Sequence, residues 1–202
     1  MAKTIITIGR QFGSNGRNIG RKLAEKISAN FYDKELINET AKESGLSEEF
    51  LKSLDEKPTR SFLYSLDPYS YGFTSAGYQT NLNQQAFQAT YDTIKKLADK
   101  GPSVFVGRCA DYALRHNTNL VRIFIHAPLE ERIKNVSERF NLTPDKAKAQ
   151  IVKEDKARAS YYNYYTSKKW GALESYDIFI NSSLMSEDDT VDFIIDYIDR
   201  IK

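Results

Sequence analysis

The sequence predicts an α/β protein whose parallel sheet is covered by helices on both faces. Short runs of β-branched and aromatic residues alternate with segments whose apolar residues recur at helical spacing. The strand-like runs are almost uniformly apolar, which is typical of strands buried on both faces. Strands that alternate with helices along a chain indicate a parallel sheet between helical layers.

The first predicted elements are a strand, a glycine-rich loop and a helix. The strand covers residues 4–8, TIITI, and the loop runs from Gly9 to Gly20 with the sequence GRQFGSNGRNIG. From near Arg17 onward, apolar residues recur every three or four positions, which predicts a helix with one buried face. The residues on this face are Ile19, Leu23, Ala24 and Ile27.

A second strand and a divergent segment follow. Residues 30–32, NFY, form a short strand, and Asp33 is placed to cap the helix that comes next. Residues 41–83 are polar, weakly periodic and rich in serine and tyrosine, with proline and glycine interrupting them. We expect this segment to be an insertion of short helices and loops outside the core.

The middle of the chain returns to the alternation of strands and helices. Residues 87–98 have helical spacing, and the pair Gly101-Pro102 ends that helix. Two buried strands follow at residues 103–106 and 120–125, and the first of them leads into the pair Gly107-Arg108.

The last third contains three helices and one strand. Pro128 begins a helix with an apolar face, and Thr143-Pro144 begins a highly charged helix. Residues 178–180 form the fifth strand. Ser186, with Asp189 three positions later, caps the final helix.

Composition and charge narrow the function classes. The 202 residues carry a formal net charge of +2, which is too balanced to indicate a nucleic-acid or membrane partner. No apolar stretch approaches the ~18 residues that span a bilayer, and no signal peptide is recognisable. The single cysteine, Cys109, cannot form an intramolecular disulfide, so we expect a reducing, cytoplasmic location. These features leave the oligomeric state open.

Polar residues follow three of the predicted strands at their carboxyl ends. In an open parallel sheet, ligands bind in the crevice at this edge. We therefore expect these residues to lie close together and to bind a phosphate or ribose group. They are the loop Gly13–Asn18, Asp33, and the segment from Gly107-Arg108 to Asp111.

The glycine-rich loop has the layout of a phosphate-binding loop. Such loops hold phosphate with successive backbone N–H groups at the start of a helix. A lysine reaches the outer phosphates, and a serine or threonine binds magnesium. In this register Arg17 takes the lysine position, Asn18 takes the serine or threonine position, and Gln11 replaces the first glycine. The residues expected to contact phosphate are Gly13, Ser14, Asn15, Gly16, Arg17 and Asn18.

These replacements change the chemistry of the loop. Arginine is always charged and grips phosphate oxygens through a planar fork, so Arg17 keeps the electrostatic role. Asn18 offers a metal only a neutral carbonyl oxygen, which makes it a weak candidate ligand for Mg2+. A tight turn that binds no ligand is the alternative interpretation of this motif taken by itself.

A dinucleotide-binding loop is a second alternative. That motif requires a glycine two positions after another, and this chain has Asn15 there. Asp33 is the acidic residue that such a site would use for a ribose. The stretch YYTSK resembles the tyrosine–lysine pair of short-chain dehydrogenases, but the serine that accompanies this pair would fall near Ile151.

The charged helix carries a second candidate cluster. In the stretch KEDKARASYY, Asp155 and Arg158 are three positions apart and therefore share one helical face. A charge run of this kind commonly forms only solvated local ion pairs. Its place between the fourth and fifth strands is where phosphoryl-transferring kinases carry a lid, whose arginine closes over the phosphates and excludes water.

Five stretches of the chain, in family order, resemble the cytidylate kinase-like family, a branch of the nucleoside monophosphate kinases. They are TIITIGRQFGSNGRNIGRKLAEKI, FYDKELI, VFVGRCADYAL, EDKARASYYNYYTSKKWG and YDIFINSS. The resemblance implies the three-layer fold of P-loop kinases. It also implies a single domain over residues 1–202, with a core at 1–40, 84–142 and 172–202, a substrate-binding insertion at about 41–83 and a lid at about 143–171.

The resemblance also implies roles for individual residues. The loop Gly13–Asn18 would hold the donor phosphates of ATP, with Mg2+ as the expected cofactor, and Arg17 and Arg158 would be the catalytic cations. Arg108 would grip the acceptor phosphate, and Asp155 would contact a ribose. The family's cytosine-reading aspartate is replaced by Cys109, for which Asp111 is the candidate substitute. The expected acceptor contacts are Asp33, Arg108, Asp111, Asp155 and Arg158.

The expected function is transfer of the γ-phosphoryl group of ATP to a nucleoside monophosphate such as CMP. Two alternatives stay open because the loop lysine and the cytosine-reading aspartate are replaced, and because Ile151 replaces the first lid arginine. One alternative is a module that binds a nucleotide or phosphate without catalysis. The other is a kinase for a different small metabolite, which the segment 41–83 would select.

Overall fold

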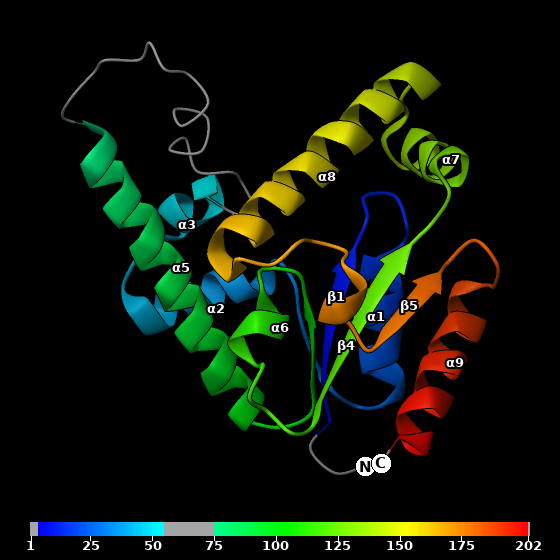
Figure 1. Cartoon of the computed structure of the whole chain (residues 1–202), viewed down its shortest axis with the longest axis horizontal. Helices are drawn as coiled ribbons and strands as arrows, with labels where there is room; N and C mark the ends of the chain where they lie inside the picture. Colours follow the sequence, from blue (N-terminus) through cyan, green and yellow to red (C-terminus); the bar gives the residue numbers. More distant parts are fainter. Residues whose placement is uncertain (1–3, 55–74, 202) are drawn as a thin grey trace.

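Five parallel strands form the centre of the protein. The computed structural model describes residues 4–54 and 75–201, with residues 75–81 described by their backbone only. Across the sheet the strand order is β2-β3-β1-β4-β5, and every neighbouring pair is parallel (Figure 1). The predicted α/β architecture with a five-stranded parallel sheet is confirmed. The strands are β1 (Ile5–Arg10), β2 (Asn30–Tyr32), β3 (Ser103–Val106), β4 (Leu120–His126) and β5 (Ile178–Asn181).

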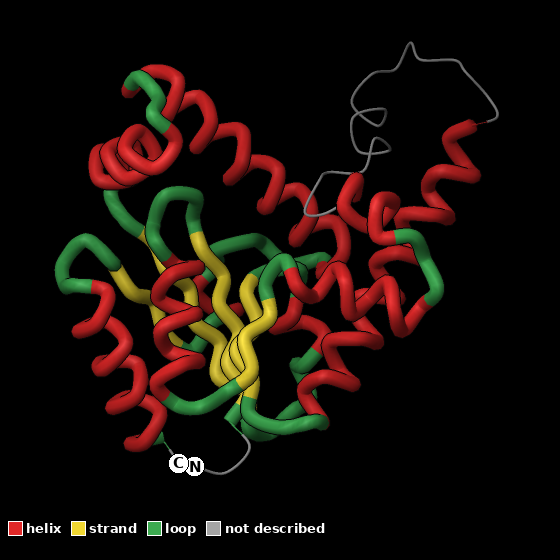
Figure 2. Tube along the Cα trace, turned by 180° about the vertical axis from the view of Figure 1, so that it is seen from behind, coloured by secondary structure: helices red, strands yellow, loops and turns green. Residues whose placement is uncertain are grey.

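Two helices, α1 and α9, cover one face of the sheet and lie over the strands in Figure 2. Ile6 of β1 turns to this face and packs in one buried cluster with Leu23 of α1 and Ile194 of α9. The hydroxyl of Ser186 accepts the backbone N–H of Asp189, so the predicted cap of α9 is confirmed. The bounds of the two helices are Gly16–Lys26 for α1 and Glu187–Arg200 for α9.

Three helices, α2, α5 and α6, cover the opposite face. Ile5 of β1 and Phe105 of β3 turn to this side and pack with Leu36 of α2 and Ile94 of α5. Successive residues of a strand point to opposite faces, which is why Ile5 and Ile6 belong to different clusters. A short helix, α3, packs against α2 and α5. The bounds are α2 (Glu35–Ser44), α3 (Glu48–Leu54), α5 (Ser75–Asp99) and α6 (Ala110–Ala113).

A hairpin of two helices, α7 (Leu129–Phe140) and α8 (Pro144–Thr166), stands above the carboxyl edge of the sheet (Figure 1). The predicted start of α8 at Thr143-Pro144 is confirmed, and the hydroxyl of Thr143 accepts the N–H of Lys146. Phe12, from the loop between β1 and α1, packs into the apolar core of the hairpin. No helix within residues 4–54 or 75–201 is long and apolar enough to cross a membrane. A 3-10 turn, Leu173–Ser175, leads from α8 to β5.

The segment after β2 differs from its prediction. Helices α2 and α5 extend into both ends of the stretch 41–83, and its middle, residues 55–74, lies outside the described residues. The expected cap of α2 by Asp33 is wrong, because the N-cap residue is Lys34 and no side chain bonds to the helix end. The carboxylate of Asp33 is instead bound by Arg17 and Arg108, which direct its two oxygens away from the end of α2.

Candidate functional site

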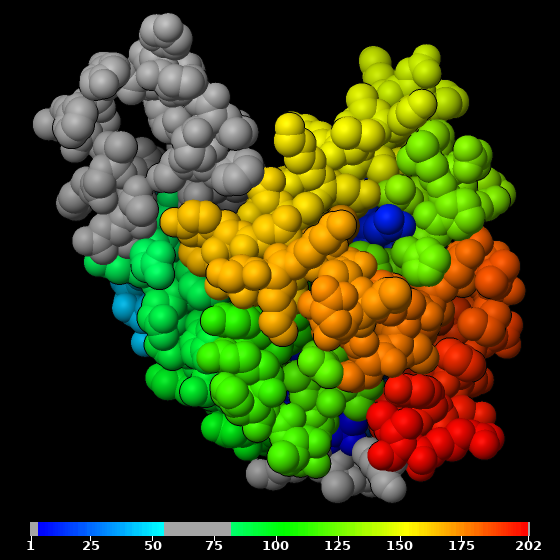
Figure 3. Space-filling model, viewed as in Figure 1, coloured from blue at the N-terminus to red at the C-terminus, as the bar shows by residue number. Residues whose placement is uncertain are grey.

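A cleft opens at the carboxyl ends of β1 and β3, beneath α8. It encloses about 360 Å³ including its mouth. The space-filling view shows α8 and the segment after it roofing this edge in yellow and orange, with blue surface from the start of the chain beside them (Figure 3). The cleft lies at the edge of the sheet where ligands of parallel α/β proteins bind. It is lined by Thr7, Ile8, Gly9, Arg10, Gly107, Arg108, Cys109, Asp111, Arg158, Tyr161, Tyr162, Trp170 and Tyr176.

The loop between β1 and α1 is tightly folded against α7. Gly13 has a φ of +84°, and a Cβ atom at this position would lie 2.9 Å from the carbonyl oxygen of Arg132, so only glycine fits. The buried hydroxyl of Ser14 lies 2.9 Å from the carbonyl oxygen of Gln11 and 3.1 Å from that of Ile125. Ser14, expected to contact phosphate, therefore has its side chain directed into the protein.

The first turn of α1 presents backbone donors beside this loop. The N–H of Ile19 bonds to the carbonyl oxygen of Asn15, and it is the first N–H of α1 that an α-helical bond can reach. The N–H groups of Gly16, Arg17 and Asn18 precede it and have no intrahelical acceptor. No acidic residue stands in this first turn. The positive end of the helix dipole and these N–H groups together can hold an anion.

Arg17 and Arg108 meet at the carboxylate of Asp33. The Nε atom of Arg17 lies 2.5 Å from one oxygen of Asp33, and Nη1 of Arg108 lies 3.2 Å from the other. Burial favours the neutral acid, but the charges of Arg108, Arg17 and Arg10 outweigh it and hold the pKa of Asp33 below its usual value. Asp33 and Arg108, which were expected to contact the acceptor, thus form one charge cluster with Arg17, which was expected to contact the donor.

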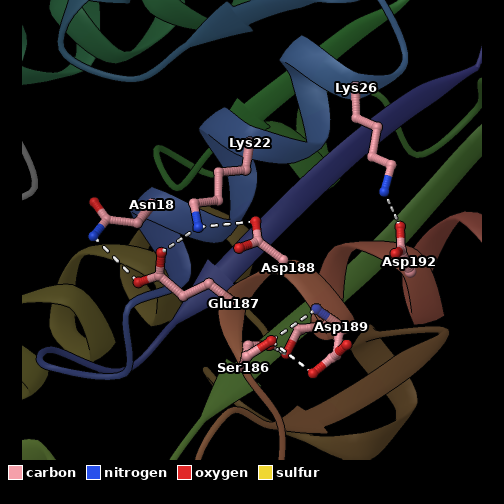
Figure 4. Close-up of polar contacts among 9 residues, drawn as sticks. Asn18, Lys22, Lys26, Ser186, Glu187, Asp188, Asp189 and Asp192 are labelled. Atoms are coloured by element: carbon pink, nitrogen blue, oxygen red, sulfur yellow. Dashed lines mark hydrogen bonds and ion pairs between the residues drawn. The ribbon is translucent and has the colours of Figure 1, made fainter.

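Asn18 faces helix α9 (Figure 4). Its amide nitrogen donates to Glu187 at 3.3 Å, and Lys22, one turn further along α1, bonds Glu187 and Asp188. Asn18 therefore offers a metal one neutral oxygen, whereas Mg2+ is commonly bound through one or two carboxylates together with substrate phosphates. Within the described ranges, no group of three or more His, Cys, Asp or Glu side chains could hold a metal ion. The residues around Asn18 do not make a metal site by themselves.

Asp155 and Arg158 of α8 both contact the loop. One carboxylate oxygen of Asp155 accepts the backbone N–H of Phe12 at 2.7 Å, and the other accepts from Arg132 of α7 at 2.6 Å. Arg158 donates to the carbonyl oxygen of Arg10 at 3.1 Å, and its guanidinium lies over the ring of Phe12 at 5.4 Å. Asp155 does not line the cleft where a ribose contact was expected, whereas Arg158 does.

A buried polar pair forms the wall of the cleft on the side of α6. The hydroxyl of Tyr162 donates to the carboxylate of Asp111 at 2.7 Å. Burial raises the pKa of Asp111, and the bond from Tyr162 only partly offsets that effect. Trp170 packs edge-on against Phe124 nearby. Asp111 therefore lines the cleft among aromatic side chains.

Three residues of this region escape sequence reasoning. Arg10, at the end of β1, is buried and lines the cleft, and its only signal is a charged residue at the end of an apolar strand. Arg132 is buried on α7, where nothing in the spacing distinguishes it from its charged neighbours. Thr7 also lines the cleft, and its buried hydroxyl has no hydrogen-bond partner among the described residues.

Comparison with solved structures identifies the architecture. A crystal structure of an uncharacterized protein from Eubacterium ventriosum ATCC 27560 matches with a TM-score of 0.74 and 33% identity, covering 98% of this chain and 99% of that one. Shikimate kinase from Acinetobacter baumannii matches with a TM-score of 0.52 and 14% identity, over 100% of this chain and 96% of that one. A gluconokinase from Sinorhizobium meliloti 1021 matches with a TM-score of 0.54 and 11% identity, over 98% of this chain and 93% of that one. These similarities confirm the P-loop kinase fold.

Curated relatives agree with this assignment. A cytidylate kinase from Methanopyrus kandleri is 24% identical over 98% of this chain and 94% of its own length, and one from Methanosarcina acetivorans is 26% identical over 97% of both. A cytidylate kinase from Sulfolobus acidocaldarius is 30% identical over 43% of this chain, which is 48% of that relative. The family model described as "Cytidylate kinase-like family" matches residues 5–184. The chain therefore belongs to the cytidylate kinase-like family.

Proposed function

We propose that this protein is a kinase that transfers the γ-phosphoryl group of ATP to a nucleoside monophosphate, with CMP as the first candidate. The observation that carries the proposal is the convergence of Arg10, Arg108 and Arg158 on one small cleft beside the phosphate-binding loop. Guanidinium groups bind phosphate oxygens in a bidentate manner. The charge of this cleft therefore suits an anionic acceptor, and Tyr161, Tyr162, Trp170 and Tyr176 supply aromatic surface beside it for a base.

The donor end of the proposed reaction is the loop Gly13–Asn18. The first-turn N–H groups of α1 would bind the donor phosphates, and Arg17 would exchange Asp33 for a phosphate oxygen as ATP arrives. Arg17 and Arg158 would then stabilise the charge that spreads over the transferred group. Phosphoryl transfer of this kind depends on positioning and electrostatics, and it requires no covalent intermediate. ATP is the proposed donor. Mg2+ is the metal expected to accompany it.

The state of Asp33 favours a phosphate acceptor over a hydroxyl acceptor. A hydroxyl group must lose its proton during transfer, and a general base with an oxygen free to accept that proton assists this step. The pKa of Asp33 is lowered, and its oxygens are held by Arg17 and Arg108. A phosphate acceptor is already anionic and needs no such base. We assign Arg108 to the acceptor phosphate and Asp111, with Tyr162, to the base.

A steady-state assay tests this function. Purified protein with ATP, Mg2+ and a panel of nucleoside monophosphates should release ADP fastest with CMP or a related pyrimidine nucleotide. Release of ADP no faster than without an acceptor, across the whole panel, would overturn the proposal. Turnover only with another phosphorylated metabolite would keep the kinase and replace the acceptor, whose choice we assign to the segment 41–83. A cytoplasmic location stays a prediction.

A non-catalytic nucleotide-binding module is the second candidate. The observation that favours it is the engagement of Arg17 by Asp33 and of Asn18 by Glu187, which directs both replaced loop residues away from a donor. Calorimetry distinguishes the two candidates. Binding of ATP or CMP that is unchanged by magnesium, together with no turnover, would support the module.

A further inference from the structure

Helix α7 packs along the outer side of the loop between β1 and α1, the proposed phosphate-binding loop. Its residues Arg132, Asn135 and Arg139 are spaced by three and four, so they share one helical face. Nη1 of Arg132 lies 3.4 Å from the carbonyl oxygen of Phe12, and Nδ2 of Asn135 lies 2.9 Å from that of Gly13. Arg139 bonds the side-chain oxygen of Asn15 at 2.7 Å. One side of the loop is therefore held by donors from a single helix face.

Asp155 completes this arrangement from α8. It accepts the N–H of Phe12, while Arg132 reaches both the carbonyl oxygen of Phe12 and the second carboxylate oxygen of Asp155. The side chains of Arg132 and Asp155 are only 10% and 18% exposed, so solvent screens their interaction weakly. The ring of Phe12 is also fixed, because it stacks on Phe140 at 6.0 Å.

We propose that Arg132 and Asp155 are positioning residues for the donor loop, so that Asp155 supports the binding of ATP through the backbone of Phe12 and does not contact the ribose of the acceptor. This inference rests on the proposed kinase function. A lone carboxylate beside a phosphate-binding loop would repel the donor. Arg132 cancels that charge and leaves Asp155 available to orient the peptide group of Phe12, which begins the stretch of backbone that binds phosphate.

The kinetic test separates the two substrates. Asp155→Ala and Arg132→Met should each raise the KM for ATP about tenfold, because each removes a charge-assisted hydrogen bond, and should change the KM for CMP less than twofold. Asp155→Asn keeps an acceptor for the Phe12 N–H and should have a smaller effect. The double variant Arg132→Met/Asp155→Asn should bind ATP better than Arg132→Met alone, because it removes the uncompensated carboxylate. Lys156→Met, an exposed neighbour on α8, is the matched control.

The opposite pattern would overturn the proposal. A raised KM for CMP with an unchanged KM for ATP in Asp155→Ala would make Asp155 an acceptor ligand. An equal rise in the KM for ATP in Arg132→Met and in the double variant would show that the charge of Asp155 does not weaken ATP binding.

A second readout does not depend on catalysis. Hydrogen exchange at the Phe12 amide should be slow in the wild type and in Asp155→Asn, and at least tenfold faster in Asp155→Ala. Equal exchange in the wild type and Asp155→Ala would refute the contact even in an inactive protein. Slow exchange of the Phe12 amide without any turnover would instead refute the kinase function and confirm the contact between Asp155 and Phe12. If Asp155→Ala does not fold, Arg132→Met and its double variant with Asp155→Asn still test the proposal through the KM for ATP and the KM for CMP.

Discussion

The Nε atom of Arg17 lies 2.5 Å from the carboxylate of Asp33, and Nη1 of Arg108 lies 3.2 Å from its other oxygen. Arg17, at the start of α1, and Arg108, which follows β3, therefore share one buried carboxylate. The side chain of Arg17 is 42% exposed, whereas those of Asp33 and Arg108 are 5% exposed. Arg17 can change partner at a lower desolvation cost than Arg108, which makes it the part of the cluster that responds to an anion.

Asp33→Asn should destabilise the protein and make its stability depend on anions. Removal of the carboxylate breaks its ion pair with the buried Arg108, and loss of one partner of a buried pair typically costs about 3 kcal/mol. Urea unfolding measures this loss. Phosphate or pyrophosphate should restore part of it, because an anion that binds only the folded state adds stability.

The matched control is Asp199→Asn, an exposed carboxylate on α9. It should change the free energy of unfolding little and respond to anions as the wild type does. A Asp33→Asn variant whose unfolding midpoint does not move with pyrophosphate would show that the two arginines do not form an anion site.

Asp111→Asn should remove the pH dependence of stability that Asp111 contributes. Burial raises the pKa of Asp111 in the folded state. The folded protein therefore holds this proton over a pH range in which the unfolded chain has lost it, so stability falls as pH rises from about 4 to the raised pKa. The amide variant has no proton to lose and can still accept from Tyr162. Its melting temperature should exceed that of the wild type by a margin that grows across this range and then stays constant.

Comparison of the wild type with Asp111→Asn isolates the effect of Asp111 titration on stability. Asp33 contributes with the opposite sign, because its lowered pKa adds stability above the unfolded value that is lost as pH falls. That contribution is present in both proteins and cancels in the difference. A difference in melting temperature that is the same at pH 4 and pH 8 would mean that Asp111 is not protonated abnormally in the folded state.

Gly13→Ala should impair folding and anion binding together. The position requires a φ of +84°, and the new Cβ would meet the backbone oxygen of Arg132 at 2.9 Å, which cannot move away as a flexible side chain would. Strain of this kind costs about 1–3 kcal/mol. Thermal unfolding with and without pyrophosphate measures both effects. Gly45→Ala is a useful comparison, since Gly45 also has a positive φ but no atom within 4 Å of its Cβ position.

The sequence predicts the scaffold well because its strands are uniformly apolar and its helices carry clear end signals. Ser103–Val106 is found with the predicted bounds, α8 begins at the predicted Thr143-Pro144, and the cap at Ser186 forms as expected. These features depend on neighbours along the chain. The side of the cleft that each charged residue serves depends instead on the packing between helices.

Asp155 illustrates what helical spacing cannot show. Its separation from Arg158 indicates a shared face of α8, but the hairpin with α7 determines what that face meets. Arg132, which binds Asp155, lies 23 residues away in sequence and has no distinguishing neighbour pattern. The cap predicted at Asp33 was wrong for the same reason, because Arg108 approaches from a different strand.

Thr7→Val should stabilise the protein and weaken its binding of the acceptor. The hydroxyl of Thr7 is buried, lines the cleft and has no hydrogen-bond partner among the described residues. Valine has nearly the same shape, so the substitution removes an unsatisfied polar group at a cost of little packing. The expected gain is about 1 kcal/mol, or about 3 °C in melting temperature for a chain of this size.

If the acceptor supplies the missing partner of the Thr7 hydroxyl, the same variant should raise the KM for CMP severalfold and leave the KM for ATP unchanged. Thr190→Val, whose hydroxyl bonds the carbonyl oxygen of Ser186, is the control and should lose stability. A Thr7→Val protein that gains stability with an unchanged KM for CMP would show that this hydroxyl does not contact the acceptor.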